Sequence, residues 1–271
     1  EVTVPKSGPD AKMQLHVQRC GAGEPLLILH GLFGSGTNWR TLSRTFAEHF
    51  EVWLLDARNH GRSGHANTMS YPDMAADVFE LMDASGLDSV HLMGHSMGGK
   101  TAMWAALMQP RRVRSLTVAD IAPVAYAREL GPELKAMRGL ELASIARRAD
   151  AEAALAAEVQ DRGVRAFLLQ NLQIDSNGAR WRINLDAIAR SQSTLVGFPK
   201  TSSVPPYAGP TLFVRGGVSN YVQDAHWPAI RAVFTAAQLA TLAGAGHWLH
   251  AEQPGPFATA VQHHLQSNMA T

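Results

Sequence analysis

The sequence predicts an α/β fold with a mostly parallel, doubly wound sheet and an inserted helical cap. Short apolar runs of strand length alternate with segments of helical periodicity up to residue 120 and again near the C-terminus. Between residues 122 and 204, Ala, Arg, Glu and Leu predominate and no buried strand is predicted. The pentapeptide at 94–98 lies between a predicted strand and a predicted helix. We therefore divide the chain into a core of residues 1–121 and 205–271 and a helical cap of residues 122–204.

The predicted elements follow in the order that such a sheet requires. Alternation around a turn at 7–10 predicts an opening hairpin within residues 1–20. The later strands are continuous apolar runs, which are typical of strands buried on both faces, and helical patterns separate them. We expect strands at 25–30, 51–56, 89–93, 112–120, 211–215 and 238–243, and helices at 38–50, 74–86, 99–108, 225–234 and from 256.

Composition excludes several classes of protein. A chain of 271 residues with 46% hydrophobic residues can bury a large core in one domain. The net charge is +1 and there is no long basic run, so nucleic-acid or membrane-surface binding has little support. The single cysteine, Cys20, cannot form an internal disulfide, which suits the cytoplasm, the location we expect. No apolar stretch approaches the ~20 residues of a membrane span. The sequence does not begin with Met, which leaves open the removal of an N-terminal segment.

The Gly-His-Ser-Met-Gly sequence at 94–98 has the pattern G-x-S-x-G, which predicts a nucleophile elbow. A serine on a sharp strand-to-helix turn is exposed at the end of the strand, and the small neighbours Gly94 and Gly98 make that turn sterically possible. The following helix directs its free N–H groups and the positive end of its dipole toward Ser96. Ser96 is therefore the predicted nucleophile, although a glycine-rich turn with an incidental serine has the same five letters.

A serine hydroxyl needs a base to remove its proton, and we assign this role to His247. It lies in Gly-Ala-Gly-His-Trp at 244–248, after the last predicted strand and before the final helix. That loop overhangs the elbow in this topology, and the order serine, acid, histidine along the chain is the expected one. We expect His95 to pack or hydrogen-bond within the elbow. Structural roles are expected for His30, His60, His250, His263 and His264.

An oxyanion at the substrate carbonyl needs two backbone N–H donors. The first is the amide of Met97, the residue after the nucleophile. The second is expected from the loop His-Gly-Leu-Phe-Gly at 30–34, whose glycines allow close approach to the substrate oxygen. Within this loop we assign the donor to Leu32 rather than Phe33.

Five motifs occur in order along the chain: His-Gly-Leu-Phe-Gly-Ser at 30–35, Asp-Ala-Arg-Asn-His-Gly-Arg-Ser at 56–63, Gly-His-Ser-Met-Gly-Gly-Lys at 94–100, Asp-Ile-Ala-Pro-Val at 120–124 and Gly-Ala-Gly-His-Trp-Leu-His-Ala-Glu at 244–252. Together they resemble the α/β-hydrolase superfamily, and within it most of all the YbfF-type esterases and their eukaryotic abhydrolase relatives. The resemblance extends over nearly the whole chain. It implies a serine carboxylesterase that acts on acyl esters, and some relatives take acyl-CoA thioesters.

The acidic member of the site is predicted less directly than the serine and the histidine. Most of the superfamily place it shortly after the strand at 211–215, where this sequence has Ser219. Asp120, at the end of a preceding core strand, and Asp224, a few residues late, are the two carboxylates that could replace it. The YbfF-type group resembles this sequence in carrying its acid in the Asp-Ile-Ala-Pro motif, which maps onto Asp120. We assign the role to Asp120 and keep Asp224 as the alternative.

Several bulky apolar side chains are candidates to line a substrate pocket, although each could equally belong to the core. They are Phe33, Met97, Trp181, Phe198, Tyr221 and Trp248. No metal is expected, because His247 and His250 have the spacing of one helical face but lack a third ligand arranged as in zinc hydrolases. No cofactor is expected either, since the dinucleotide fingerprint G-x-G-x-x-G is absent.

The predicted reaction is hydrolysis of a small-molecule acyl ester through an acyl-enzyme, with Ser96, His247 and Asp120 as the triad. The same apparatus supports thioester cleavage or other hydrolysis. Some proteins of this fold only bind a ligand, which is the alternative from a different class. The natural ester, the preferred acyl length and the oligomeric state are not predicted.

Overall fold

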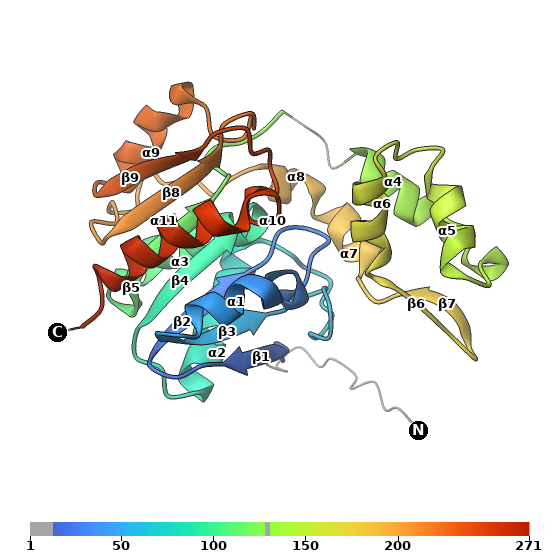
Figure 1. Ribbon diagram of the computed structural model, residues 1–271, viewed down its shortest axis with the longest axis horizontal. Helices are drawn as coiled ribbons and strands as arrows, with labels where there is room; N and C mark the ends of the chain where they lie inside the picture. Colours follow the sequence, from blue (N-terminus) through green and yellow to red (C-terminus); the bar gives the residue numbers. More distant parts are fainter. Residues whose placement is uncertain (1–12, 128–130, 271) are drawn as a thin grey trace.

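A twisted sheet forms the centre of the computed structural model, which describes residues 13–127 and 131–270 (Figure 1). Within these residues the sheet has seven strands in the order β1-β3-β2-β4-β5-β8-β9. β1 runs antiparallel to β3, and all other neighbours are parallel. The strands are β1 (Val17–Cys20), β2 (Glu24–Leu29), β3 (Phe50–Leu55), β4 (Val90–His95), β5 (Val113–Ala119), β8 (Thr211–Gly216) and β9 (Ala237–Leu242).

Helices cover both faces of this sheet. They are α1 (Arg40–Phe46), α2 (Tyr71–Ala84), α3 (Met97–Met108), α9 (Trp227–Val233), α10 (Leu249–Glu252) and α11 (Pro254–Gln266). Successive residues of a strand point to opposite faces, and β2 follows this rule. Leu26 and Ile28 pack in one apolar cluster with residues of α1 and α11, whereas Leu27 and Leu29 pack in the other with residues of α2, α3 and α9. This two-sided burial is the reason why the strands appear in the sequence as continuous apolar runs.

Residues 122–204, which we call the inserted segment, leave the sheet after β5 and return before β8. In Figure 1 most of its elements lie to one side of the sheet. The segment contains α4 (Gly131–Gly139), α5 (Arg148–Leu155), α6 (Arg162–Leu169), β6 (Leu172–Asp175), β7 (Gly178–Trp181), α7 (Leu185–Arg190) and α8 (Gln192–Val196). Its apolar side chains form a third cluster that also includes Phe33, Tyr71 and Met97 from beside the elbow.

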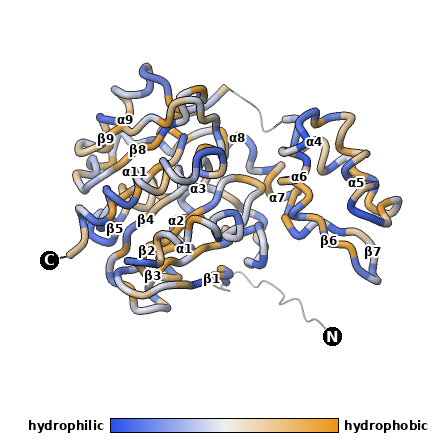
Figure 2. Tube along the Cα trace, viewed as in Figure 1, coloured by the Kyte–Doolittle hydropathy of each residue, from blue (hydrophilic) through white to orange (hydrophobic). Residues whose placement is uncertain are grey.

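The fold class predicted from the sequence is confirmed, and the six strands predicted from residue 25 onward lie within one or two residues of those observed. The second half of the predicted opening hairpin is shorter than expected, since β1 begins at Val17 and pairs with β3. The hairpin of β6 and β7 is not predicted, because most of its residues are exposed or half-buried and therefore give no buried run. Figure 2 shows apolar residues along the central strands and more polar ones on the outer helices. The first half of the predicted opening hairpin lies outside the described residues. Among the helices of the described chain, none has the length and apolar character that crossing a bilayer requires.

Candidate active site

Ser96 lies at the sharp turn between β4 and α3, in a conformation that few non-glycine residues adopt. Its φ of 52° and ψ of −117° leave the side chain at the end of the strand, at the N-terminus of α3. The turn is possible because both flanking residues lack a side chain. A Cβ atom at Gly94 would overlap the carbonyl oxygen of Gly98, and one at Gly98 would overlap that of Leu29. The G-x-S-x-G pattern therefore corresponds here to a strained strand-to-helix turn.

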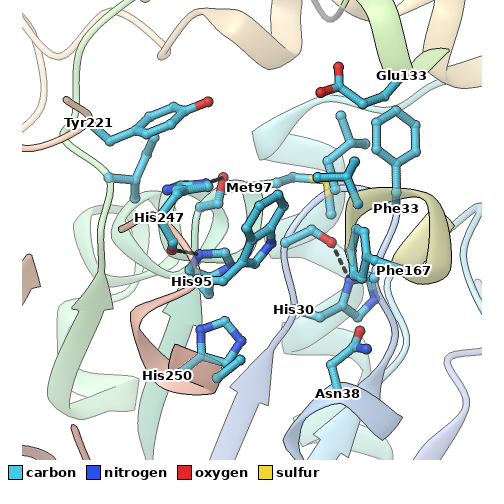
Figure 3. A pocket seen from close by; sticks show the side chains of 18 of the residues that line it. His30, Phe33, Asn38, His95, Met97, Glu133, Phe167, Tyr221, His247 and His250 are labelled. Carbon is cyan, nitrogen blue, oxygen red and sulfur yellow. Dashed lines mark hydrogen bonds between the residues drawn. The ribbon is translucent and has the colours of Figure 1, made fainter. Parts of the chain in front are cut away.

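A line of hydrogen bonds joins Ser96, His247 and Asp120. The Ser96 Oγ lies 3.2 Å from Nε2 of His247, and Nδ1 of the same ring lies 2.8 Å from Oδ2 of Asp120. Because an ionised carboxylate only accepts hydrogen bonds, the proton belongs on Nδ1, which leaves Nε2 to accept the serine hydroxyl. In Figure 3 the His247 ring lies between Tyr221 and His95, and the Tyr221 ring stacks on it with centroids 3.9 Å apart.

Asp120 is fully buried at the end of β5 and is held on both carboxylate oxygens. Oδ1 accepts from the amide of Gly216 at 3.1 Å, and Oδ2 accepts from the hydroxyl of Ser219 at 2.5 Å. Its φ of 49° is also in the left-handed region. Asp224, the alternative from the sequence, instead pairs with Arg215 at 2.6 Å through a side chain that is 90% exposed. The structure thus places Asp120 next to His247 and Asp224 on the surface.

Buried histidines support the loop that carries His247. Nε2 of His95 donates to the carbonyl oxygen of His247 at 2.8 Å. Burial, together with the nearby His250 and His247, keeps the pKa of His95 well below its usual value, so this ring is neutral. Burial lowers the pKa of His250 to about 3, and its ring stacks on Trp39 with centroids 4.3 Å apart. The His95 ring packs against those of His247 and His250, and His95 and His250 both border the cavity.

Leu32 and Met97, the two predicted amide donors, lie beside the same cavity as Ser96. The described part of the chain offers neither amide a hydrogen-bond acceptor. The amide of Phe33, by contrast, donates to Nε2 of His60 at 3.2 Å. It is therefore engaged elsewhere, which favours Leu32 as the second donor.

A cavity of about 830 Å³ opens over Ser96, between the sheet edge and the inserted segment. Four of the predicted lining residues border it: Phe33, Met97, Tyr221 and Trp248. Trp181 and Phe198 lie outside its lining. The indole N–H of Trp181 donates to the carbonyl of Met137 inside the inserted segment, and Phe198 packs behind Tyr71 and Trp104.

Other lining residues were not singled out from the sequence. Phe167 and Leu168 come from α6, whose apolar residues recur at helical spacing, and this pattern could have identified them. Lys100 lies one turn after Ser96, and its ammonium donates to three backbone carbonyls, those of Val124, Val196 and Gly197. Burial lowers the pKa of Lys100 to about 7. No local pattern reveals these contacts, because the acceptors belong to the two ends of the inserted segment.

The described residues contain no group of three or more His, Cys, Asp or Glu side chains arranged to hold a metal ion. The arrangement is instead one of a serine, a histidine, a buried carboxylate and two backbone amides beside one cavity. Such a set can transfer a proton from the serine and hold a negative oxygen without a cation.

Comparison with known proteins places this geometry in a family. Residues 24–254 match the family described as alpha/beta hydrolase fold. The chain belongs to this family. The hydrolase is 41% identical over 245 residues to a mouse protein named sn-1-specific diacylglycerol lipase ABHD11, with 87% of this chain and 79% of the relative covered. It is 34% identical to the Escherichia coli K12 protein named Esterase YbfF, with 89% of this chain and 92% of the relative covered.

A solved structure gives the same result for the fold and the class of enzyme. A marine microorganism esterase superposes with a TM-score of 0.89 at 38% sequence identity, with 93% of this chain and 99% of that chain covered. The resemblance to YbfF-type esterases expected from the motifs is confirmed. The hydrolase is a carboxylic ester hydrolase.

Proposed function

We propose that the hydrolase cleaves acyl esters through a covalent acyl-enzyme on Ser96, with His247 as general base and Asp120 as the group that orients it. The observation that carries the proposal is the continuous hydrogen-bonded line from Ser96 Oγ through both ring nitrogens of His247 to Asp120. A line of this kind transfers the hydroxyl proton to the imidazole as the serine attacks, and the carboxylate stabilises the imidazolium that forms.

The reaction proceeds in two halves. In the first, Ser96 Oγ bonds to the ester carbonyl carbon while its proton moves to Nε2 of His247. The amides of Leu32 and Met97 hold the oxyanion, and the imidazolium then protonates the leaving alkoxide as the acyl C–O bond breaks. In the second half, His247 takes a proton from water, the hydroxide oxygen attacks the acyl carbon, and Ser96 leaves with that proton.

The inserted segment acts in this proposal as a cap that walls the substrate space. α6 supplies Phe167 and Leu168 opposite the elbow, and α8 supplies Leu195. A cavity of about 830 Å³ with mostly apolar walls suits an ester that carries an apolar acyl chain. Glycerides belong among the substrates to be tested, because the mouse relative is named a diacylglycerol lipase.

The test compares Ser96→Ala with Ser193→Ala, which removes an exposed serine of α8. We expect Ser96→Ala to fold normally and to abolish both p-nitrophenyl ester hydrolysis and labelling by a fluorophosphonate, since each step passes through that oxygen. Ser193→Ala should behave as the wild type. EDTA should change neither the ester hydrolysis nor the labelling of the wild-type protein. Hydrolysis that persists in Ser96→Ala contradicts the serine mechanism. A wild-type protein that is not labelled supports a ligand-binding role instead.

A further inference from the structure

The Phe33 residue, in the loop that carries the Leu32 amide, has a backbone conformation that needs external support. Its φ is 63°, in the left-handed region that a bulky side chain rarely adopts. Strain of this kind persists only where neighbouring groups fix it. The peptide units on both sides of Phe33 must therefore be held by contacts from outside the loop.

Two buried side chains supply those contacts, and they come from different parts of the chain. Nε2 of His60, a fully buried core residue, accepts the N–H of Phe33 at 3.2 Å. Nδ2 of Asn171, which is 4% exposed, donates to the carbonyl oxygen of Phe33 at 2.8 Å. The strained residue is thus hydrogen-bonded on its donor side by the core and on its acceptor side by the inserted segment.

His60 can serve as an acceptor only in one neutral tautomer, and its surroundings select that form. Its Nδ1 donates to the carbonyl oxygen of Arg58 at 3.0 Å, which leaves Nε2 unprotonated. Burial and the nearby His30 lower the pKa of His60 to about 3. The ring therefore stays neutral throughout the pH range in which esterases are assayed.

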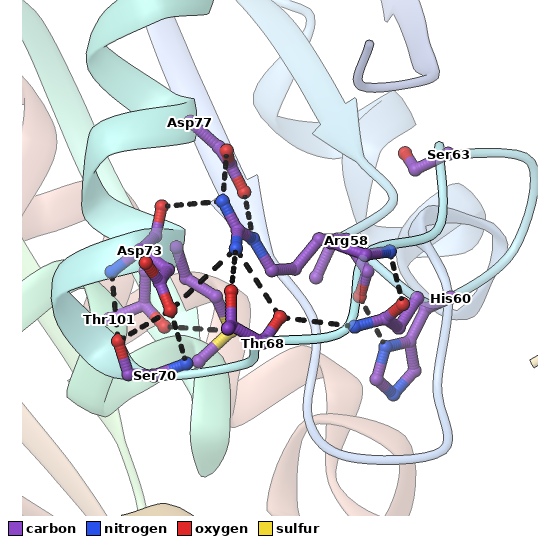
Figure 4. A network of polar contacts seen from close by, with 12 residues as sticks. Arg58, His60, Ser63, Thr68, Ser70, Asp73, Asp77 and Thr101 are labelled. Atoms are coloured by element: carbon purple, nitrogen blue, oxygen red, sulfur yellow. Dashed lines mark hydrogen bonds and ion pairs between the residues drawn. The ribbon is translucent and has the colours of Figure 1, made fainter. Parts of the chain in front are cut away.

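The segment that carries His60 is fixed by a buried ion pair (Figure 4). The Arg58 guanidinium donates through Nε and Nη2 to the two carboxylate oxygens of Asp77 on α2, each at 2.7 Å, and it also reaches Thr68. Asp56, at the start of the same motif, accepts the amide of Gly36 at 2.7 Å. The 56–63 motif thus forms a rigid support for the loop at 30–36, and its residues take no direct part in the proposed reaction.

Asn171 is the counterpart in the inserted segment, at the corner between α6 and β6. Its Nδ2 also donates to the carbonyl of Leu168 at 3.1 Å, which fixes the side chain toward Phe33. The preceding residue adds a second hydrogen bond between the inserted segment and the core, because Oε1 of Gln170 accepts from Nδ2 of Asn38 at 2.9 Å. This corner is where the inserted segment meets the loop that offers the Leu32 amide.

We propose that Asn171 and His60 are positioning residues that hold the Phe33 peptides, so that the oxyanion hole is complete only while the α6–β6 corner is seated on the core. The inference rests on the proposed function and deepens it. A donor stabilises the oxyanion only when it lies about 2.7–3.1 Å from that oxygen, so a loosened loop costs energy in the transition state. The bound ester loses little, because its carbonyl carries less charge.

The experiment compares Asn171→Ala with Asn177→Ala, an exposed asparagine in the turn of the same inserted segment. Steady-state hydrolysis of a p-nitrophenyl ester gives kcat and KM. Inhibition by an alkyl trifluoromethyl ketone, which adds the serine and leaves an oxyanion, reports the hole directly. We expect Asn171→Ala to lower kcat by about 10- to 100-fold and to raise the ketone Ki by a similar factor, with KM within about twofold, since removing an oxyanion donor outright costs more. Asn177→Ala should match the wild type.

Further variants keep the outcome decisive. Asn171→Asp preserves the size of the side chain but removes both amide donors. It should lower kcat and raise the ketone Ki as Asn171→Ala does, and it replaces that variant if the alanine protein folds poorly. His60→Gln retains an acceptor and should recover part of the kcat that His60→Ala loses. Unchanged kcat and Ki in folded Asn171→Ala and Asn171→Asp overturn the inference while leaving the esterase proposal intact. A wild-type protein without Ser96-dependent hydrolysis overturns the proposed function instead.

Discussion

The core and the inserted segment differ in where strain and titratable groups are found. All twelve histidines belong to the core, and residues 122–204 contain none. The non-glycine residues of the described chain with positive φ are Phe33, Asn59, Ser96 and Asp120, and all four lie in the core. The inserted segment contributes apolar walls and a few polar contacts, such as that of Asn171. In the proposed mechanism, proton transfer takes place at a strained sheet edge, and the more exposed segment would select the molecules that reach it.

Burial shows the same contrast within single strands. Every residue of β4, which leads to Ser96, is buried, whereas β7 in the inserted segment has none that is. A strand enclosed on both faces tolerates few changes of side-chain volume, and an exposed hairpin tolerates many. Substitutions at buried strand positions of the core should therefore alter folding or catalysis, whereas substitutions in the exposed hairpin of the inserted segment should have small effects.

The largest expected effect separates two carboxylates of the core. Asp120→Asn should lower kcat by about 10³- to 10⁴-fold with the fold intact, because the amide no longer fixes the His247 tautomer or stabilises its charge. Asp224→Asn should change kcat by less than about tenfold, since that side chain lies on the surface with Arg215. Steady-state kinetics of the two purified variants decide the question. The assignment of Asp120 is wrong if Asp224→Asn shows the large loss of kcat and Asp120→Asn does not.

A second pair of variants compares backbone space in the two regions. A methyl group at Gly98 would collide with the Leu29 carbonyl, whereas nothing lies within 4 Å of the corresponding position at Gly139 in α4. Gly98→Ala should cost about 1–3 kcal/mol of unfolding free energy or more, because overpacking forces the surrounding backbone to shift. Gly139→Ala should be neutral or slightly stabilising, as it replaces a poor helix former. Urea denaturation measures the unfolding free energy of both variants. Equal losses of stability would contradict the expected difference between the two regions.

Acid should destabilise the protein through the core histidines. Burial lowers the folded-state pKa of His60 and His250 to about 3 and that of His264 to about 4, from an ordinary value of 6.5. Between pH 6.5 and these values the unfolded chain binds more protons, so stability is complete above pH 6.5 and falls as the pH drops. Each such group contributes about 1.4 kcal/mol per pH unit over its window.

Unfolding free energies at pH 7.5 and 4.5 test this expectation. His264, on α11, does not border the cavity, so His264→Leu should reduce the acid loss without changing kcat at pH 7.5. A pH dependence identical to that of the wild type would show that His264 does not contribute.

The smallest expected effect concerns two tryptophans that the sequence could not distinguish. Trp248 is 36% exposed at the cavity, with its ring 6.0 Å from that of Phe167 in the inserted segment. Trp248→Leu should raise KM by about two- to fivefold at similar kcat, because part of the apolar wall is lost. Trp181→Leu should leave KM unchanged, because Trp181 does not line the cavity and its indole N–H donates to the carbonyl of Met137 instead. A larger KM effect from Trp181 would mean that the cavity extends further than described.

The features that the sequence predicted well are local ones. Buried strands, the elbow and the loop of His247 each produce a pattern within about ten residues. The assignment of Asp120 as the acid needed the family resemblance, because Ser219 stands where most of the superfamily place that acid. The support of Phe33 by Asn171 was not predictable, since the two residues are 138 positions apart and their hydrogen bond leaves no periodic signal. Aromatic residues such as Phe198 could not be assigned to core or cavity, because both environments favour the same side chains.

The hydrogen bond from Ser219 to Asp120 bears on which strand end supplies the acid in related enzymes. β5 and β8 are adjacent, and residues that follow them meet at one carboxylate oxygen: Oδ2 of Asp120 accepts from the Ser219 hydroxyl and also faces Nδ1 of His247. We therefore expect a carboxylate at position 219 to lie near the same imidazole, with a small hydroxyl donor in place of Asp120. Exchange of the two side chains, Asp120→Ser with Ser219→Asp, moves the acid to a different strand while the base and the nucleophile stay in place. During the divergence of such enzymes, the position of the carboxylate beside the histidine could thus be kept while the residue that supplies it changes.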